Sequence, residues 1–268
     1  MIRSASNQKI KSVIALRDKA KVRRAQGAFL IEGIHLLSEV NREDVLEAFV
    51  SESFLQKADK NALKKLQAVC PQYETLTDPV FLKISDTKTP QGVLVVVKRS
   101  NRSAEDLFAH APEGKKSLLL LCERIQDPGN LGTILRTAEA AGATGVIISS
   151  DSADPYSPKV VRATMGAILR IPFATVESVT EAVNLCKANG TPVYAATLEK
   201  AQSYDTISYK GPCAFVVGNE GEGLLPETIA AATQSVFIPM EGKTESLNAA
   251  IASALLLYEA NRQRRNGQ

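Results

Sequence analysis

The sequence predicts an α/β protein with a mostly parallel sheet, covered by helices on both faces, in its carboxy-terminal half and a smaller α/β domain before it. Three observations predict this fold class. Short apolar runs alternate with segments of helical periodicity in both halves of the chain. The runs of the second half are continuously apolar, as in strands that are buried on both faces. A polar segment rich in helix and strand breakers, at residues 98–116, separates the two halves.

The basic amino terminus comes first along the chain. Residues 1–28 contain eight Lys or Arg and one Asp, a charge of +7 in a chain whose net charge is +3. Helical spacing predicts one amphipathic helix over residues 6–25, through Ile10, Val13, Ile14 and Arg17. Such a helix can simply present a solvated charged face. It can also be an arm that binds RNA or DNA phosphates, because clustered cations release counterions on binding, and the scarcity of acidic partners favours this interpretation.

The smaller domain follows, up to about residue 98. The pattern predicts strands at residues 29–33, 45–50 and 92–97, and helices at residues 35–40 and 54–69. Gly33 closes the first of these strands. The alternation of strand and helix predicts a small α/β domain.

The second half begins after the polar residues 98–103 and the breaker cluster at residues 112–116, where we place the domain boundary. A buried strand is predicted at residues 117–122. Further strands are predicted at residues 145–150, 192–196, 214–217 and 236–238, and helices at residues 131–141, 160–169, 179–188 and 246–265. Continuous apolar strands separated by helices predict the parallel, two-sided sheet.

The final predicted helix has more apolar surface than one packing face needs. Leu256 and Leu257 lie outside the main apolar stripe, which contains Leu247, Ala250, Ile251, Ala254, Leu255 and Tyr258. The helix can be buried on two sides within one chain, or its second side can meet another subunit. The pattern leaves both interpretations open.

Composition narrows the class of protein. No apolar stretch approaches the roughly 20 residues of a membrane helix, and the amino terminus lacks the apolar core of a signal peptide, so we expect a cytoplasmic protein. The four cysteines form no CxxC pair, which favours buried free thiols. With two histidines in the chain, a His-rich metal site is not expected.

The first segment with candidate functional residues is 123–138. A strand ends there, a Pro-Gly turn follows, and a helix begins near Asn130. Gly129 and Gly132 permit close backbone approach, but their spacing is GxxG, so neither the GxGxxG fingerprint of dinucleotide-binding folds nor a phosphate loop is present. Arg136 lies one to two turns into the helix, where it can form a surface salt bridge or act in a site.

The second segment is 215–226, where a buried strand runs directly into a turn with three glycines and two carboxylates. Ligands of open parallel sheets bind at such strand ends. A purely flexible turn would account for the glycines, but it has no need of Asn219 and Glu220 at the mouth of the strand.

The third segment is 238–250, where a strand ends and a polar loop leads into the final helix at Glu245 or Ser246. Ser246 has the chemistry of an N-cap residue, which would be a purely structural role. Asn248 is a weak helix former in the first turn of this helix and is therefore the stronger functional candidate.

Together the three segments resemble the motifs of the SpoU, or TrmH-like, branch of the SPOUT methyltransferases. The matching residues are Asn130, Gly132 and Arg136-Thr-Ala in the first motif, Gly218-Asn-Glu-x-x-Gly-Leu in the second, and Ile238-Pro-Met with Ser246-Leu-Asn248 in the third. Order and spacing fit throughout residues 117–260. The first half resembles the substrate-binding domain often attached to this family, in Phe29-Leu-Ile-Glu-Gly33 and Pro90-Gln-Gly-Val-Leu94.

The resemblance implies a trefoil knot in the carboxy-terminal half, which general topology rules would reject. It implies a homodimer, with the second side of the final helix at the interface, while the composition already argues against a membrane or metal partner. It also implies that S-adenosylmethionine binds in the knotted loops, largely through backbone groups, near Thr197, Gly218, Asn219, Ile238, Met240 and Leu247.

The reaction implied by the resemblance is methyl transfer from S-adenosylmethionine to a ribose 2′-hydroxyl of structured RNA. In this family the arginine that matches Arg136 is proposed to activate the hydroxyl. Because arginine stays protonated, we expect Arg136 to bind a nucleotide phosphate and stabilise alkoxide character, while the proton passes to water or a neighbour. Asn130, Glu220, Ser246 and Asn248 would line the same site, with Glu220 either catalytic or structural.

We therefore expect a basic helical arm at residues 1–28, an RNA substrate-binding domain at residues 29–105 and a SPOUT methyltransferase domain at residues 116–268. A separate first domain favours large structured RNA, with large-subunit ribosomal RNA ahead of transfer RNA. The alternatives are a transfer RNA 2′-O-methyltransferase, or a non-catalytic RNA-binding or ribosome-assembly protein that need not keep Asn130, Arg136 and Asn248 together. A nucleotide-dependent oxidoreductase is disfavoured by the missing fingerprint.

Overall fold

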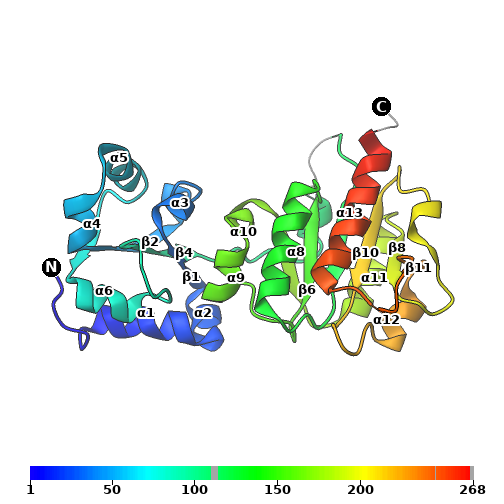
Figure 1. Ribbon diagram of the computed structural model, residues 1–268, viewed down its shortest axis with the longest axis horizontal. Helices are drawn as coiled ribbons and strands as arrows, with labels where there is room; N and C mark the ends of the chain where they lie inside the picture. The colour runs from blue at the N-terminus through cyan, green and yellow to red at the C-terminus, as the bar shows by residue number, and fades with distance from the viewer. Residues whose placement is uncertain (110–113, 245, 266–268) are drawn as a thin grey trace. The chain divides into compact units, whose positions relative to one another are not determined.

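The computed structural model describes residues 1–109, 114–244 and 246–265. Residues 110–113 of the predicted boundary, and Glu245 as a predicted helix start, lie outside this description. The chain divides into two compact units, one of residues 1–100 and 154–169 and the other of residues 101–153 and 170–268. Each unit has its own sheet (Figure 1).

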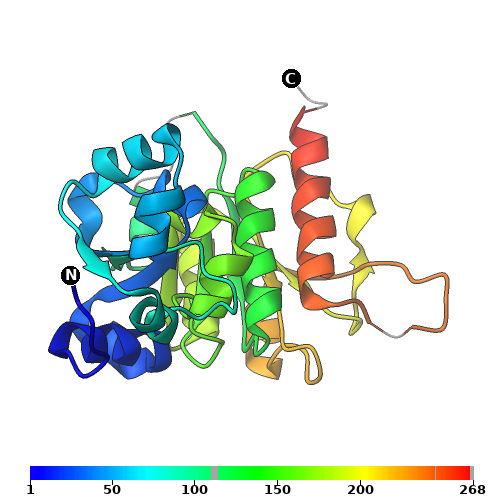
Figure 2. The ribbon, with the colours of Figure 1, turned by 60° about the vertical axis from the view of Figure 1, so that its left-hand side comes forward.

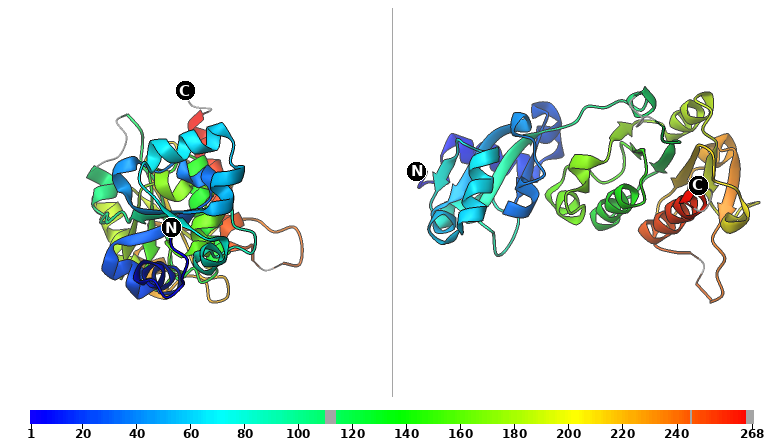
Figure 3. Two further views of the ribbon diagram at one scale, coloured as in Figure 1. Left: turned by 90° about the vertical axis from the view of Figure 1, so that its left-hand side faces the viewer. Right: turned by 90° about the horizontal axis from the view of Figure 1, so that it is seen from above.

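The sheet of the first unit has four strands in the order β1-β4-β2-β3. β4 (Val93–Lys98) is central and runs antiparallel to both β1 (Ala28–Glu32) and β2 (Val45–Ser51), while β3 (Glu74–Leu76) runs parallel to β2. Figures 1 and 3 show three helices on one face, α1 (Gln8–Asp18), α2 (Ala20–Gln26) and α6 (Asp78–Ile84). The other face carries α3 (Ile34–Leu37), α4 (Glu52–Lys57) and α5 (Lys60–Val69).

The predicted helix over residues 54–69 is two helices, α4 and α5, because Ala58 leaves the helical conformation and the Asp59 side chain caps the second helix at Ala62 N. β3 and α6 were absent from the sequence prediction. The strand is only three residues long, which is too short for a period-two pattern.

The basic amino terminus is part of the first unit and not a separate arm, which differs from the expected boundary at residue 28. Lys19 is extended (φ −124°, ψ 111°) and divides the single predicted helix into α1 and α2. Ile10, Val13 and Leu16 are buried on one side of α1, in the same core as Phe49 of β2. The apolar side of α1 therefore covers the sheet, while its basic side remains outside.

A second difference concerns residues 154–169, which belong to the first unit although they lie in sequence between two strands of the second. Arg23 donates to Asp154 at 2.7 Å with its side chain only 5% exposed, and the Tyr156 ring lies 4.7 Å from that of Phe29. The predicted helix over residues 160–169 is interrupted at Met165 (φ 50°), which separates α9 (Pro158–Ala163) from α10 (Ala167–Arg170). These contacts join residues more than a hundred positions apart, which local patterns do not encode.

The second unit contains the predicted parallel sheet, with seven strands in the order β7-β6-β5-β10-β8-β11-β9. All of its strand pairs are parallel. The strands are β5 (Leu118–Cys122), β6 (Gly145–Ser149), β7 (Phe173–Val176), β8 (Val193–Ala196), β9 (Gln202–Ser203), β10 (Cys213–Val217) and β11 (Gln234–Phe237). The predicted sheet is confirmed, with β7 and β9 as strands that the sequence pattern did not reveal.

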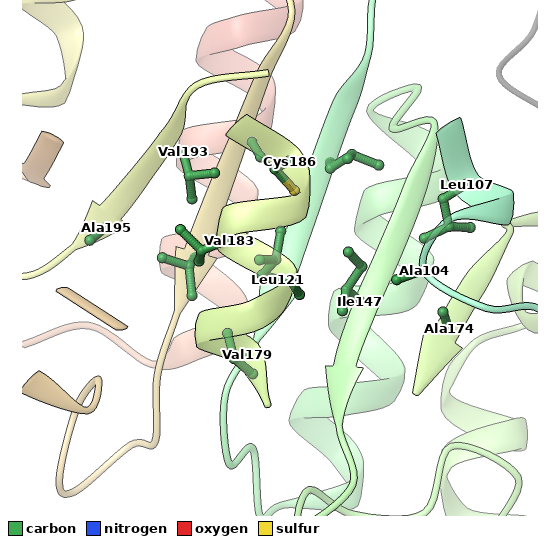
Figure 4. Packing of buried hydrophobic residues seen from close by; sticks show 14 of the residues in the cluster. Ala104, Leu107, Leu121, Ile147, Ala174, Val179, Val183, Cys186, Val193 and Ala195 are labelled. Atoms are coloured by element: carbon green, nitrogen blue, oxygen red, sulfur yellow. The ribbon is translucent and has the colours of Figure 1, made fainter. Parts of the chain in front are cut away.

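Helices cover both faces of this sheet. α8 (Pro128–Ala140) and α13 (Ala249–Arg265) lie side by side on one face (Figure 2). The other face packs against α11 (Val179–Ala188), with α12 (Pro226–Ala231) beside it. Figure 4 shows Leu121 and Ile147 pointing toward Val183 of α11, in a core that also contains α7 (Asp106–Ala109). Successive residues of a strand point to opposite faces of the sheet, so each face is packed by every second residue, as expected for a sheet buried on both sides.

The four cysteines are free and buried, as the sequence predicted. Burial raises the pKa of the Cys70 thiol to about 11 and that of Cys122 to about 12. These thiols therefore stay protonated at neutral pH and act as small apolar side chains.

The two apolar sides of α13 have different surroundings. Leu256 and Leu257 are fully buried within the second unit, whereas Ile251, Leu255 and Tyr258 are 51%, 37% and 46% exposed. Their spacing of four and three residues places these exposed side chains on one face of the helix. The side with Leu256 and Leu257, which lies outside the main predicted stripe, therefore packs inside the unit, and part of the main stripe is exposed. In the described part of the chain, no helix is both long and apolar enough to cross a membrane.

Candidate functional site

A pocket of about 440 Å³ lies at the carboxyl ends of three adjacent strands, β10, β8 and β11. Gly218, Thr197 and Ile238 are the first residues after these strands, and all three line the pocket. Parallel strands bring their carboxyl ends to one edge of the sheet, where ligands of α/β folds bind. The sequence prediction used this geometry for the turn after β10, while Thr197 and Ile238 were expected from the family resemblance.

Eight of the predicted site residues line the pocket. They are the six expected cofactor residues, Thr197, Gly218, Asn219, Ile238, Met240 and Leu247, together with Glu220 and Ser246. Three other predicted residues, Asn130, Arg136 and Asn248, are not among the lining residues.

A chain of hydrogen bonds links the three motifs beside the pocket. The side-chain Nδ2 of Asn130 donates to Glu220 Oε1 at 2.7 Å, and the side-chain Nδ2 of Asn248 donates to Asn130 Oδ1 at 2.9 Å. Asn130 stands in the first turn of α8, whose N-cap Asp127 accepts from Asn130 N. Motifs that are 90 and 118 residues apart thus meet through Asn130.

Asn248, and not Ser246, caps the last helix. α13 begins at Ala249, and the Asn248 side-chain oxygen Oδ1 accepts from Ala250 N and Ile251 N at 2.9 and 3.3 Å. The predicted helix start at residue 246 is therefore wrong, because the loop stays irregular until an amide side chain can satisfy the free backbone N–H groups. Asn248 both caps the helix and contacts Asn130, while Ser246 stays free to line the pocket.

Arg136 stands apart from this network. Its side chain is exposed on α8, and it has no hydrogen-bond or ion-pair partner among residues 1–109, 114–244 and 246–265. An exposed guanidinium without a protein partner keeps all five of its donors for a ligand.

Asn219 shapes the turn of the second motif. Its side-chain oxygen accepts from Gly221 N and Glu222 N at 2.8 and 3.0 Å, and its amide nitrogen donates to Arg124 O at 3.0 Å. Gly218 has no room for a side chain, because a Cβ there would lie 2.4 Å from the backbone of Gly223. The turn is therefore closed tightly on itself at the pocket wall.

Two residues that the sequence prediction missed hold this loop from the end of β5. Glu123 is only 2% exposed, and its carboxylate accepts from Leu225 N at 2.7 Å and from Thr228 Oγ1 at 2.6 Å. Its own backbone N–H donates to Val217 O at 2.9 Å, so Glu123 contacts both ends of the loop. Arg124, with φ 56°, donates to Glu222 at 2.6 Å. The sequence signal that could have indicated Glu123 is a carboxylate directly after a buried apolar strand.

Glu123→Gln is expected to loosen this loop. The amide keeps the shape of the carboxylate but replaces one acceptor oxygen with a donor nitrogen, which leaves a buried donor of Leu225 or Thr228 unsatisfied. We expect a loss of about 1–3 kcal/mol in the free energy of unfolding, measured by urea denaturation, together with weaker ligand binding in the pocket by calorimetry. Glu227→Gln, on the exposed side of α12, is the matched control and should change neither. Equal behaviour of the two variants would contradict the structural role of Glu123.

The pocket fits a nucleoside-sized ligand. Its volume lies in the range of roughly 300–1,000 Å³ that is usual for small-molecule sites. Ile238, Met240 and Leu247 supply apolar walls, and the Gly218 turn brings backbone groups to the rim. This donor set suits the adenosine of S-adenosylmethionine. Within the described residues, no group of three or more His, Cys, Asp or Glu is placed to hold a metal ion.

A pocket at the strand ends of a parallel sheet, bounded by three linked loops, is where α/β proteins that bind nucleotide-type ligands hold them. Residues 117–258 match the SpoU rRNA Methylase family, and residues 7–95 match the MRM3-like substrate binding domain. The chain belongs to the SpoU rRNA methylase family.

Individual relatives agree with this assignment. The chain is 33% identical to the 23S rRNA (guanosine(2553)-2′-O)-methyltransferase RlmP of Bacillus subtilis, over 96% of this chain and 97% of that protein. It is 30% identical to the 23S rRNA (uridine(2479)-2′-O)-methyltransferase of Streptomyces viridochromogenes, over 99% and 92%. Its structure is similar to that of an AdoMet-bound rRNA methyltransferase from Sinorhizobium meliloti, with a TM-score of 0.84 at 32% identity and 97% coverage of both chains.

Proposed function

We propose that this protein transfers a methyl group from S-adenosylmethionine to a ribose 2′-hydroxyl of large-subunit ribosomal RNA. The observation that carries the proposal is the hydrogen-bonded chain Glu220–Asn130–Asn248, which joins three motifs beside a nucleoside-sized pocket. The relatives named above, which by name are 23S rRNA 2′-O-methyltransferases, support the choice of RNA and of reacting hydroxyl.

The bound cofactor would supply an electrophilic methyl group on a sulfonium. The protein must then hold the ribose oxygen in line with the methyl–sulfur bond, and such positioning supplies much of the rate. Asn130 and Asn248 fix the rim on which the ribose would rest, and Glu220 holds Asn130 in place. We assign Glu220 this positioning role because its carboxylate already accepts from Asn130.

Arg136 would hold the nucleotide phosphate and stabilise negative charge on the ribose oxygen. Its side chain is exposed and has no partner in the part of the chain that the structure describes, so it is available to a phosphate. The proton of the hydroxyl would pass to water, because a guanidinium does not accept it at neutral pH.

The amino-terminal helices would contribute phosphate contacts. Of the basic residues before position 28, Lys9 pairs with Glu74, Arg17 with Asp18, and Arg23 with Asp154. The remaining ones are exposed and have no partner among the described residues: Arg3, Lys11, Lys19, Lys21 and Arg24. Within residues 1–28, which were predicted to form an RNA-binding arm, we therefore assign the RNA contact to these five cations.

Replacing Lys11, Lys21 and Arg24 together by Gln should weaken RNA binding and flatten its salt dependence. Each lost phosphate contact lowers the slope of log affinity against log salt by about 0.7–0.9. Filter binding to a ribosomal RNA transcript at several salt concentrations measures the slope. Lys9→Gln is the control, since its charge is already paired with Glu74. A wild-type slope in the triple variant would remove these helices from the RNA contact.

The proposed assembly is a homodimer built on the exposed side of α13. Ile251→Lys with Leu255→Lys should give folded monomers by light scattering, because both side chains are exposed within one subunit. Leu256 and Leu257 serve a different role, since both are fully buried, and Lys at either position should unfold the protein. A monomeric wild-type protein at micromolar concentration would contradict the dimer.

We also expect the trefoil knot of SPOUT enzymes in the loops that line the pocket, and a cytoplasmic location, where ribosomal RNA would be accessible. The methyltransferase domain in this proposal comprises residues 116–268, with residues 154–169 packed in the first unit, and residues 29–105 provide most of the RNA-binding domain.

Mapping of 2′-O-methylated riboses in large-subunit ribosomal RNA, from cells with and without this protein, tests the function. We expect one position to lose its methyl group, and purified protein with S-adenosylmethionine to restore it on the unmethylated RNA. Methylation found in transfer RNA instead would favour the transfer RNA enzyme. RNA binding without any methyl transfer would favour a non-catalytic assembly protein.

A further inference from the structure

A second hollow of the methyltransferase unit, of about 410 Å³, lies at the opposite edge of the sheet from the cofactor pocket. It adjoins Leu118, where β5 begins, and the last turns of α13. Four of its lining residues are cationic, Lys115, Lys116, Lys210 and Arg264, and none of the described lining residues is acidic. We call this hollow the basic groove.

The floor of the basic groove is fixed by hydrogen bonds. Arg264 donates to four backbone carbonyls that frame the groove, those of Tyr209, Lys116, Ser117 and Gly211, at 2.7 to 3.1 Å. The Lys116 ammonium donates to Lys210 O at 3.0 Å. Backbone acceptors that would repel an anion are therefore already satisfied by fixed cations.

The rim of the groove carries the charges that remain available. Lys115 and Lys210 are exposed, and neither ammonium group has a partner within the described residues. Asn261 and Gln263 add amide side chains to the lining. Two ammonium groups without a described partner, above a cationic floor and with no acidic residue among the described lining residues, attract an anion of extended shape.

We propose that the basic groove binds the sugar–phosphate backbone of the RNA substrate outside the nucleotide that is methylated. The proposal rests on the proposed function and adds a second RNA contact on the methyltransferase unit. β5 has five residues, so the groove lies roughly 17 Å from the cofactor edge of the sheet. We infer that one folded RNA would contact both edges of the sheet.

An RNA backbone suits the groove better than a second protein chain. The charged residues among the described lining residues are all cationic, whereas the centre of a protein interface is depleted in charged residues. The apolar stripe of α13 at Ile251, Leu255 and Tyr258, outside the groove, offers the surface that a subunit interface prefers.

The test replaces the free rim lysines and leaves the floor intact. Lys115→Gln, Lys210→Gln and the double variant are made in the full-length protein, with Lys187→Gln on α11 as the single-site control. Binding of a large-subunit ribosomal RNA transcript is measured over a range of salt concentrations, and S-adenosylmethionine binding by calorimetry. The double variant should lose about 1–2 from the salt slope, with additive single effects, while its affinity for S-adenosylmethionine stays that of the wild type.

Three outcomes distinguish the possibilities. An unchanged RNA affinity and slope in the double variant, with a wild type that binds and methylates RNA, would overturn the groove proposal alone. A change in oligomeric mass with unchanged RNA affinity would also overturn it and make the groove a subunit contact. A wild type that transfers no methyl group, but whose RNA binding depends on Lys115 and Lys210, would support the groove and overturn the proposed function.

Discussion

Replacing Arg136 by Ala is expected to reduce methyl transfer by at least ~100-fold, which is the scale of losing one electrostatic stabiliser in a reacting site. The affinity for S-adenosylmethionine should change by less than about tenfold, or ~1.4 kcal/mol. The reason is geometric. Arg136 is exposed on α8 and does not line the cofactor pocket, so its removal affects the RNA and the developing charge but not the cofactor.

Single-turnover methylation of ribosomal RNA and calorimetry with S-adenosylmethionine measure the two quantities separately. Arg136→Lys is the informative second variant and should restore activity only in part, because lysine offers a point charge where arginine offers a bidentate fork. Normal turnover in Arg136→Ala would remove this residue from the chemistry. Lost cofactor binding in a folded variant would instead make Arg136 a binding or structural residue.

The second large effect is expected from Gly218→Ala, which should act on the cofactor. A Cβ at this position would lie 2.4 to 2.5 Å from backbone atoms of Gly223 and Leu224, and backbone cannot move aside as a flexible side chain can. Overpacking of this kind costs roughly 1–3 kcal/mol. Since the turn forms a wall of the pocket, we expect S-adenosylmethionine to bind about 10- to 100-fold more weakly.

Gly221→Ala provides the matched control in the same turn. A Cβ there would meet only the Asn219 side-chain oxygen, at 3.5 Å, which is an ordinary contact. The Gly221 backbone N–H would still donate to Asn219. Calorimetry on both variants should therefore separate them clearly. Similar losses in both would mean that the turn tolerates no side chain for reasons other than the approach to Gly223.

Strand-end geometry predicted a site after the strand at residues 214–217, while Thr197 and Ile238 were expected from the family resemblance. Thr197, Gly218 and Ile238 each come directly after an apolar run, and in a parallel sheet such positions share one edge. Their convergence in one pocket also requires that β10, β8 and β11 be neighbours in the sheet, which only the structure shows. Asn130 and Asn248 were chosen for their motif positions, and the structure joins them by a hydrogen bond.

Other features depended on contacts between distant parts of the chain. A carboxylate after a strand, as at Glu123, can face solvent or anchor a loop, and only the packing of α12 reveals the second case. The cations of the amino terminus look equivalent in sequence. Only the fold shows that Arg23 is buried against Asp154, 131 residues away, while Lys11 is exposed and has no partner among the described residues.

The sequence by itself determined the fold class and the burial of the cysteines, because hydrophobic periodicity states which positions avoid water. The residues around the pocket were expected from the motifs that resemble the SpoU family. Only the tertiary structure shows which part of the protein packs against each apolar side of a helix. Both sides of α13 are apolar in sequence, yet Leu257 is buried and Leu255 is exposed. Periodicity records that a side chain prefers an apolar environment, but the neighbour that provides it is set by sheet order and by loop closure over long separations.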